Sequence, residues 1–317
     1  MSEPLSGVRI SVTGAGGFLG PHVVEALARR GALVQAIIGP PGEPARSPAA
    51  AHSVGRADIL DAAALCTLLE GSQLVVHLAG PASVAASFQD PARTVRVHAE
   101  GTATLLEACR AARVSQVVYV SSAEVYGQPL QSPLGEAHRL SARSPYGAAK
   151  ICAEQLVEAQ VHARGVRAVI LRPFSIYGPG ASTVSLIPRI LGLARSGQPI
   201  ALRDLRPVRD YCFVTDLAEA VAAASALQGE GLEVFNIGTG KGTSVLQLAR
   251  LALLQLGANS AIQEGSERDR PGQSEILELI CDPRRARERL GWEPRVSLEE
   301  GLRRTIASLE GASGDVP

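Results

Sequence analysis

Short apolar runs alternate with segments of helical periodicity along the first half of the chain. Apolar runs with few polar interruptions are typical of strands that are buried on both faces of a parallel sheet. The runs cover Val8 to Val12, Leu33 to Ile38, Leu74 to Leu78, Val117 to Val120 and Val169 to Leu171. Between them, apolar residues recur at helical spacing, as at Leu19, Val23 and Leu27, which predicts helices that cover the sheet. We therefore predict an α/β fold built on a doubly wound parallel sheet.

The regular alternation fades after Pro173, where stretches such as LRDLRPVRDY and FNIGTGKGTS follow neither period. We interpret the change as a second, smaller and less regular α/β lobe. The predicted division assigns 1–172 to the first domain, with 208–238 returning to it, and assigns 173–207 and 239–311 to the second lobe. Residues 312–317 are predicted to form a flexible tail.

Composition and charge narrow the class of protein. A chain of 317 residues with 46% apolar residues, 31 basic and 31 acidic side chains is typical of a soluble globular protein. The chain has no cluster of Lys and Arg of the kind that binds nucleic acid or an anionic membrane, so neither is expected as a partner. No basic leader with an apolar core begins the chain, and no apolar run approaches the ~18 residues of a membrane span, so we expect a cytoplasmic protein. The five cysteines form no Cys-x-x-Cys pair, so neither a zinc site nor a disulfide framework is expected.

A glycine-rich segment, SVTGAGGFLG, joins the first apolar run to the first predicted helix. Its glycines Gly14, Gly17 and Gly20 are three residues apart. Glycine lets a backbone approach a pyrophosphate closely, and the N-terminus of the following helix offers unpaired N–H groups. A tight packing turn would explain the same glycines, so residues further along the chain have to distinguish a phosphate-binding loop from a structural turn.

Four polar residues further along the chain favour redox chemistry. Tyr146 and Lys150, in SPYGAAK, are four residues apart and share a face if the segment is helical. A nearby ammonium favours a phenolate, and lowering a tyrosine pKa from ~10 to about 7 requires roughly 4 kcal/mol. An ordinary amphipathic helix would explain this pair by itself. Ser121 and Ser122, however, follow a predicted buried strand, where doubly wound sheets build their sites, and a hydroxyl there can hold an oxygen that Tyr146 protonates or deprotonates.

With these residues in place, the chain resembles the extended short-chain dehydrogenase/reductase family, in its branch of nucleotide-sugar epimerases, dehydratases and 4-ketoreductases. The resemblance runs almost end to end through ten motifs in order, including VTGAGGFLG, VVHLAG, VVYVSSAEVYG, SPYGAAK and LRPFSIYGPG. It implies a Rossmann-like dinucleotide-binding domain with a C-terminal substrate-binding lobe. It also implies a nucleotide-sugar substrate.

The resemblance implies a role for each candidate site residue. Ser122, Tyr146 and Lys150 would form the catalytic triad, and Tyr146 and Lys150 would also contact the cofactor. The remaining cofactor contacts would be Gly14, Gly17, Phe18, Leu19, Gly20, Asp58, Ile59, Leu78, Ala79 and Gly80. Asp58 and Ile59 would bracket adenine. The substrate would contact Ser83, Ser122, Ser175 and Arg209. Arg209 resembles the arginine that binds the substrate diphosphate, and a surface salt bridge with Asp210 is the alternative.

The chain departs from the family pattern at three places that affect binding. NAD-preferring members end their second strand with an Asp that takes the adenosine ribose, whereas this chain has Ile38, so NAD and NADP both stay open. Arg46 is a candidate to receive the 2′-phosphate of NADP. His98 replaces a customary Asn and is interpreted as a helix residue. Ser175 replaces the Asn of another customary substrate contact.

The residues after Ser122 separate the reaction types. Members that eliminate water carry an Asp-Glu pair, but this chain has Ala123 and Glu124 there, which disfavours a 4,6-dehydratase. Glu124 is then either a catalytic base or a structural carboxylate. Hydride transfer at C4 of an NDP-hexose remains. We favour a 4-ketoreductase of deoxysugar biosynthesis that acts on an NDP-4-keto-6-deoxyhexose. The alternative is an NDP-hexose 4-epimerase with bound NAD. A hypothesis from a different class of function is a non-catalytic regulator that binds a dinucleotide on the same fold, and the intact triad disfavours it.

Two small-residue segments predict a homodimer. TVRVHAEGTATLLEACRAA and YGAAKICAEQLVEAQVHA resemble the dimer helices of the family. Their apolar residues extend beyond one core-facing stripe, at Ala99, Ala103, Leu106, Cys109, Ala148, Ala149, Cys152, Leu156 and Ala159. We expect a four-helix bundle with two helices from each subunit. Burial between the sheet and the second lobe is the alternative explanation.

Overall fold

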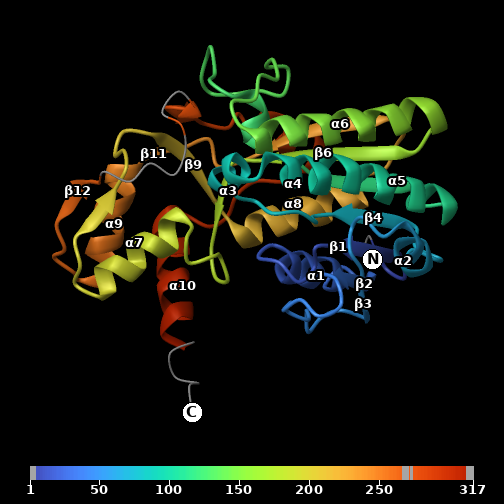
Figure 1. The fold of residues 1–317 in the computed structure, drawn as a ribbon, viewed down its shortest axis with the longest axis horizontal. Helices are drawn as coiled ribbons and strands as arrows, with labels where there is room; N and C mark the ends of the chain where they lie inside the picture. Colours follow the sequence, from blue (N-terminus) through green and yellow to red (C-terminus); the bar gives the residue numbers. More distant parts are fainter. Residues whose placement is uncertain (1–4, 266–270, 272–273, 312–317) are drawn as a thin grey trace.

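The computed structural model describes residues 5–265, 271 and 274–311 (Figure 1). The predicted tail at 312–317 lies outside the described residues. Within the described ranges, no helix has the length and apolarity needed to cross a membrane.

A seven-stranded parallel sheet forms the centre of the larger lobe, in the order β10-β6-β5-β4-β1-β2-β3. Its strands are β1 (Arg9–Thr13), β2 (Leu33–Ile38), β3 (Ser53–Arg56), β4 (Leu74–His77), β5 (Gln116–Val120), β6 (Arg167–Pro173) and β10 (Leu232–Ile237). The order reverses between β1 and β4, and doubly wound sheets bind ligands beyond the carboxyl ends of strands at such a reversal. The predicted doubly wound sheet is confirmed.

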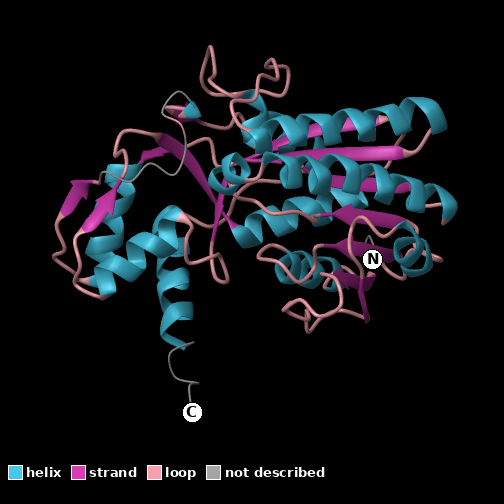
Figure 2. Ribbon diagram, viewed as in Figure 1, coloured by secondary structure: helices cyan, strands magenta, loops and turns pink. Residues whose placement is uncertain are grey.

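Helices cover both faces of this sheet (Figure 2). On one face, α1 (Gly20–Ala28) packs against α8 (Val214–Ala226). On the other face, α5 (Gly101–Ala111) lies between α2 (Ala62–Leu68) and α6 (Pro145–Arg164). Short helices α3 (Val84–Gln89) and α4 (Pro91–Val95) lead through a π-helical turn (Arg96–Glu100) into α5. A 3₁₀ turn (Ala123–Tyr126) follows β5. The polar ends of β1, β4 and β5 and the start of α6 are thereby brought to one edge of the sheet.

The smaller lobe lies beyond this edge, at the left of Figure 1. Its strands are β7 (Ser175–Tyr177), β9 (Val208–Phe213), β11 (Gly242–Ser244) and β13 (Glu278–Leu279) in one sheet, and β8 (Ile200–Leu202) and β12 (Ile262–Glu264) in another. Helices α7 (Leu186–Arg195), α9 (Val245–Leu256) and α10 (Leu298–Gly311) pack with them around their own apolar core. A π-helical turn (Ala286–Leu290) precedes α10.

The predicted domain boundaries remain a prediction, but the topology describes the return segment in detail. Residues 208–213 form β9, which pairs with β7, β11 and β13 of the smaller lobe. Helix α8 and strand β10 follow and belong to the large sheet and its covering layer. We therefore place the crossing back to the first domain at Val214, where α8 begins, rather than at residue 208.

Candidate active site

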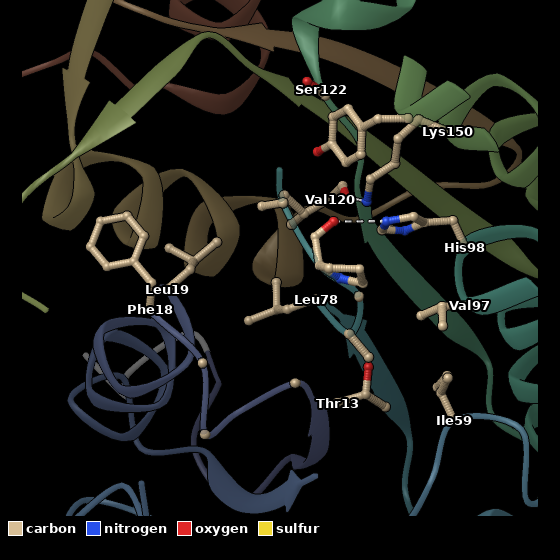
Figure 3. Close-up of a pocket in the computed structure, with 18 of the residues that line it drawn as sticks. Thr13, Phe18, Leu19, Ile59, Leu78, Val97, His98, Val120, Ser122 and Lys150 are labelled. Carbon is tan, nitrogen blue, oxygen red and sulfur yellow. Dashed lines mark hydrogen bonds between the residues drawn. The ribbon is translucent and has the colours of Figure 1, made fainter. Parts of the chain in front are cut away.

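A cavity of about 690 Å³ opens at the carboxyl edge of the large sheet and extends to the smaller lobe. Its wall combines the loops after β1, β2, β4 and β5 with the start of α6 and with residues of the smaller lobe such as Ile176 and Leu279. Most sequence-predicted site residues meet here: Gly14, Gly17, Phe18, Leu19, Asp58, Ile59, Leu78, Ala79, Gly80, Ser122, Glu124, Tyr146, Lys150 and Ser175. Figure 3 shows Phe18 and Leu19 on one side of this cavity, and His98 and Lys150 on the other.

The glycine loop needs its glycines for close backbone packing. Gly14 has a φ of +69°, and a Cβ there would lie 2.7 Å from the backbone nitrogen of Ala79. A Cβ on Gly20 would lie 2.2 Å from the carbonyl oxygen of Ala15. Gly20 is not among the lining residues, so its contribution is the packing of α1 against the loop. Leu19 at the N-cap of α1 has no polar side chain to satisfy the first N–H groups of the helix, which therefore remain available to an anion. The loop fits the pyrophosphate of a dinucleotide.

Helix α6 positions the Tyr146 and Lys150 side chains because its start is fixed. Ser144 at the N-cap accepts a hydrogen bond from the backbone N–H of Gly147 at 3.1 Å, and Pro145 begins the first turn. Tyr146 and Lys150 are both buried. The Lys150 Nζ donates to the carbonyl oxygen of Val120 at 2.9 Å and lies 5.9 Å from the centre of the Tyr146 ring. The end of β5 and the start of α6 are thus joined directly at the lysine.

Burial dominates the protonation of these two side chains. It lowers the pKa of Lys150 to about 7, although the Glu154 carboxylate acts in the opposite direction. It raises the pKa of Tyr146 to about 12, although a hydrogen bond with Ser122 acts to lower it. The lowered tyrosine pKa that the Tyr146 and Lys150 spacing suggests is not provided by the protein part of the site alone. With its pKa lowered to about 7, Lys150 carries only part of its positive charge near pH 7 and stabilises a phenolate less than a full ammonium would, so the positive charge of a bound oxidised nicotinamide would have to contribute.

A buried ion pair lies behind the triad, and the sequence analysis missed it. Glu154, one turn after Lys150 on α6, binds the guanidinium of Arg172 on β6 with Nη2 to Oε2 at 2.7 Å. Ser121 donates to the same carboxylate at 2.5 Å. Both charged side chains are almost fully buried, at 7% and 2% exposure. Glu154 lies four residues after Lys150 in the sequence, but that spacing does not point to a partner on β6.

His98 lines the cavity beside Tyr146. Its Nε2 donates to the carbonyl oxygen of Pro81 at 3.0 Å, the dashed line in Figure 3. The imidazole meets the Tyr146 ring edge-on, with 5.4 Å between ring centres. Burial, with a further contribution from Lys150, lowers the pKa of His98 to about 4, so the ring is neutral at pH 7. The residue interpreted as a plain helix residue therefore contacts a predicted catalytic side chain, from a π-helical turn of the kind that is frequent at functional sites.

Ser122 and the two residues after it lie at the cavity wall. The Ser122 hydroxyl accepts from the backbone N–H of Glu124 at 3.2 Å. Ala123 stands at the place of a dehydratase acid, and its methyl group is buried. Glu124 also lines the cavity. The site thus offers one carboxylate next to the triad instead of two.

Three of the remaining predicted or candidate residues lie outside the cavity lining. Ser83 caps α3, accepting from the Ala86 N–H at 3.1 Å, while its neighbours Pro81 and Ala82 line the cavity. Arg209 pairs with Glu275 at 3.1 Å. The alternative of a salt bridge with Asp210 is not what the structure has, because that carboxylate accepts from Thr239, Gly240 and Cys281.

The third is Arg46, the candidate for the 2′-phosphate of NADP. A Cβ placed on Gly180 in the smaller lobe would lie 2.6 Å from its Nη1, so the side chain extends toward that lobe.

Comparison with known proteins places this geometry among nucleotide-sugar enzymes. The model of the NAD-dependent epimerase/dehydratase family matches residues 10–238. A UDP-glucose 4-epimerase from Azospirillum brasilense is 32% identical over 326 residues, covering 95% of this chain and 92% of that protein.

Solved structures are similar over almost the whole chain. A UDP-glucose 4-epimerase from Thermotoga maritima, in a structure with UDP-glucose, superposes with a TM-score of 0.87 at 30% identity, covering 96% of this chain and 100% of the other. A dTDP-glucose 4,6-dehydratase from Streptomyces venezuelae with NAD bound has a TM-score of 0.88 at 28% identity, covering 97% of this chain and 98% of the other. The shared fold therefore extends across different reactions.

Proposed function

Because the chain belongs to the NAD-dependent epimerase/dehydratase family, we propose that it is a nucleotide-sugar 4-epimerase that retains NAD and acts on a UDP-hexose. From the sequence alone, a 4-ketoreductase is the favoured function and the 4-epimerase the alternative. The relatives support the 4-epimerase better than the 4-ketoreductase, because UDP-glucose 4-epimerases match this chain over nearly its full length.

The observation that carries the proposal is the makeup of the site around the triad. Ser122, Tyr146 and Lys150 lie at one cavity, and Ala123 occupies the place where a dehydratase needs its acid. Without that acid, loss of water across C5 and C6 lacks one of its two proton-transfer groups. Oxidation and re-reduction at C4 needs only a hydride carrier and a base for the C4 hydroxyl.

The chain's own residues would divide this work. Tyr146 takes the proton of the C4 hydroxyl and later returns it, while Ser122 holds the same oxygen by a hydrogen bond. Lys150 binds the ribose hydroxyls next to the nicotinamide. Bound NAD would supply the chemistry of accepting a hydride from C4 and returning it.

Inversion at C4 sets a further demand, because the sugar must present its two faces in turn. The part of the cavity wall from the smaller lobe, with Phe174 and Ser175, bounds the space in which the sugar can turn. We assign substrate contacts to Ser175 and, for the diphosphate, to Arg209. Arg209 would have to share its guanidinium between Glu275 and the phosphates. Ser83, which caps α3, would contribute by holding the neighbouring lining residues Pro81 and Ala82 in place.

The test is to incubate the purified protein with UDP-glucose and, separately, with UDP-galactose, without added cofactor. Chromatography of the nucleotide sugars should show the same final mixture from both directions. A protein that leaves both sugars unchanged, yet oxidises NADH or NADPH when a UDP- or dTDP-4-keto-6-deoxyhexose is offered, would contradict the proposal of a 4-epimerase. That result would support a 4-ketoreductase instead.

We also propose a homodimer through α5 and α6, which lie side by side on one face of the molecule (Figure 1). Ala99, Leu106, Cys109 and Ala149, which the sequence analysis counted toward a second apolar face, are buried within the subunit. Ala148, Cys152 and Ala159 of α6 stay exposed. Side chains this small let helices of two subunits approach closely. Light scattering should give twice the monomer mass of 33.0 kDa, and an active particle at the monomer mass contradicts the dimer.

A further inference from the structure

The end of β2 lacks a polar side chain for the adenosine ribose. Ile38, at the position of the customary carboxylate, is 4% exposed and belongs to the apolar core under α1. Gly39 follows it and has no side chain. Neither residue can accept hydrogen bonds from ribose hydroxyls with its side chain, so any carboxylate for this purpose has to come from elsewhere in the chain.

The loop after β2 folds back over the strand end, and contacts on two sides hold it there. On one side, the Arg56 guanidinium on β3 donates to the carbonyl oxygens of Pro40 at 3.1 Å and Glu43 at 3.0 Å. On the other side, the loop touches the glycine loop, because a Cβ on Gly16 would lie 2.9 Å from the Arg46 carbonyl oxygen. The backbone around Glu43 is therefore anchored to the two elements that border the adenosine end of the cavity.

Glu43 lies where the missing carboxylate is expected. Its Oε2 is 3.9 Å from the position of a Cβ on Gly39, so the carboxylate is folded over the end of β2. Glu43, Gly39 and Pro40 line the cavity together with Asp58. A carboxylate at this edge accepts hydrogen bonds from the ribose 2′-hydroxyl of NAD, whereas NADP carries a phosphate dianion there.

The charges near this end also disfavour a 2′-phosphate. Of the charged residues that line the cavity, Glu43 and Asp58 follow β2 and β3 and are both acidic, whereas the lining cations Arg93 and Lys150 come from α4 and α6. Neither neighbouring arginine is among the lining residues: Arg56 bonds the loop carbonyls, and Arg46 extends toward Gly180. A phosphate placed beside Glu43 and Asp58 would therefore meet two carboxylates.

We propose that Glu43 replaces the missing strand-end carboxylate, binds the 2′-hydroxyl of the adenosine ribose and makes the site selective for NAD over NADP. The inference rests on the dinucleotide site of the proposed function. It assigns a specificity residue to a loop position five residues after Ile38, in place of the strand end.

The experiment equilibrates the protein with an equimolar mixture of NAD and NADP and identifies the retained dinucleotide by native mass spectrometry. We expect wild-type protein to retain NAD. Glu43→Gln should reduce this preference by on the order of tenfold, because it removes a charged hydrogen bond to the ribose of NAD and the repulsion of the phosphate of NADP. The control is Glu70→Gln, an exposed glutamate on the same domain outside the lining residues, which should keep the wild-type preference.

A second measurement isolates the adenosine end by titrating the same variants with 5′-ADP and 2′,5′-ADP. Glu43→Gln should weaken 5′-ADP and strengthen 2′,5′-ADP. Wild-type protein that retains NADP as readily as NAD overturns the inference, as does an unchanged preference in Glu43→Gln. Loss of 2′,5′-ADP binding in Arg46→Ala also overturns it, because Arg46 would then be the phosphate ligand. Retention of neither dinucleotide would contradict the proposed function as well, which distinguishes the two failures.

Discussion

Replacing Lys150 with methionine should change the pH dependence of folding stability. The methionine keeps the length of the side chain and removes the titrating amine. In the folded protein, burial lowers the pKa of Lys150 from 10.5 to about 7. Between these values the unfolded chain binds a proton that the folded chain does not, so stability rises with pH in this window. The buried amine destabilises the folded protein by its full amount below pH 7, and this destabilisation disappears above about pH 10.5.

The size of the effect follows from the two pKa values. At about 1.36 kcal/mol for each pH unit, releasing the proton costs the folded state about 4 kcal/mol at pH 7 and about 1 kcal/mol at pH 10. The methionine variant lacks this cost at every pH. It also loses the hydrogen bond to the Val120 carbonyl, which destabilises the fold by an amount that does not depend on pH. The informative quantity is therefore the change in the stability difference with pH.

The assay is urea unfolding of nucleotide-free protein, followed by circular dichroism at several pH values from 7 to 10. The stability of Lys150→Met relative to wild type should fall by roughly 3 kcal/mol over this range. The control is Lys241→Met at the other lysine of the chain, which is exposed, and its difference from wild type should stay constant. A constant difference for Lys150→Met would refute the reasoning, because the buried amine would then keep its ordinary pKa.

Three further substitutions test other parts of the site. Tyr146→Phe should lower kcat by about 10²- to 10⁴-fold while leaving dinucleotide affinity nearly unchanged, because only the titrating hydroxyl is removed; more than a few per cent of wild-type activity would exclude Tyr146 as the base. Asp58→Ala should weaken NAD binding by on the order of tenfold without changing kcat at saturating NAD, and unchanged affinity would leave Asp58 only its hydrogen bond from the Leu60 N–H. Glu154→Gln should destabilise the protein by about 3–5 kcal/mol in thermal unfolding, because Arg172 stays buried and unpaired, whereas Glu107→Gln at an exposed pair should change little; equal effects would contradict the buried ion pair.

The central strands were predictable because their residues are buried on both faces. Runs such as Leu33 to Ile38 coincide with strands of the large sheet, and the glycine loop was found because it follows one of these runs. Strand β3 was missed because it lies at the edge of the sheet, where the residues of Ser53–Arg56 are largely exposed and carry no apolar pattern.

The site was predictable to the extent that its chemistry is concentrated in short motifs. Ser122, Tyr146 and Lys150 come from two such motifs, and the fold brings them to one cavity. The partners of these residues come from distant segments and have no local signal. Arg172 on β6 binds Glu154 on α6, and His98, which contacts Tyr146, comes from the π-helical turn before α5.

The measurement that tests the central claim most directly follows the hydrogen at C4. UDP-galactose carrying deuterium at C4 is incubated with the protein and no added cofactor, and the UDP-glucose formed is analysed by mass spectrometry and NMR. The account predicts that deuterium is retained at C4 of the product, because the same hydride is removed and returned within one site. Product that forms with loss of the C4 deuterium, or a protein that forms no product and instead consumes added NADPH with a 4-keto sugar, would contradict it.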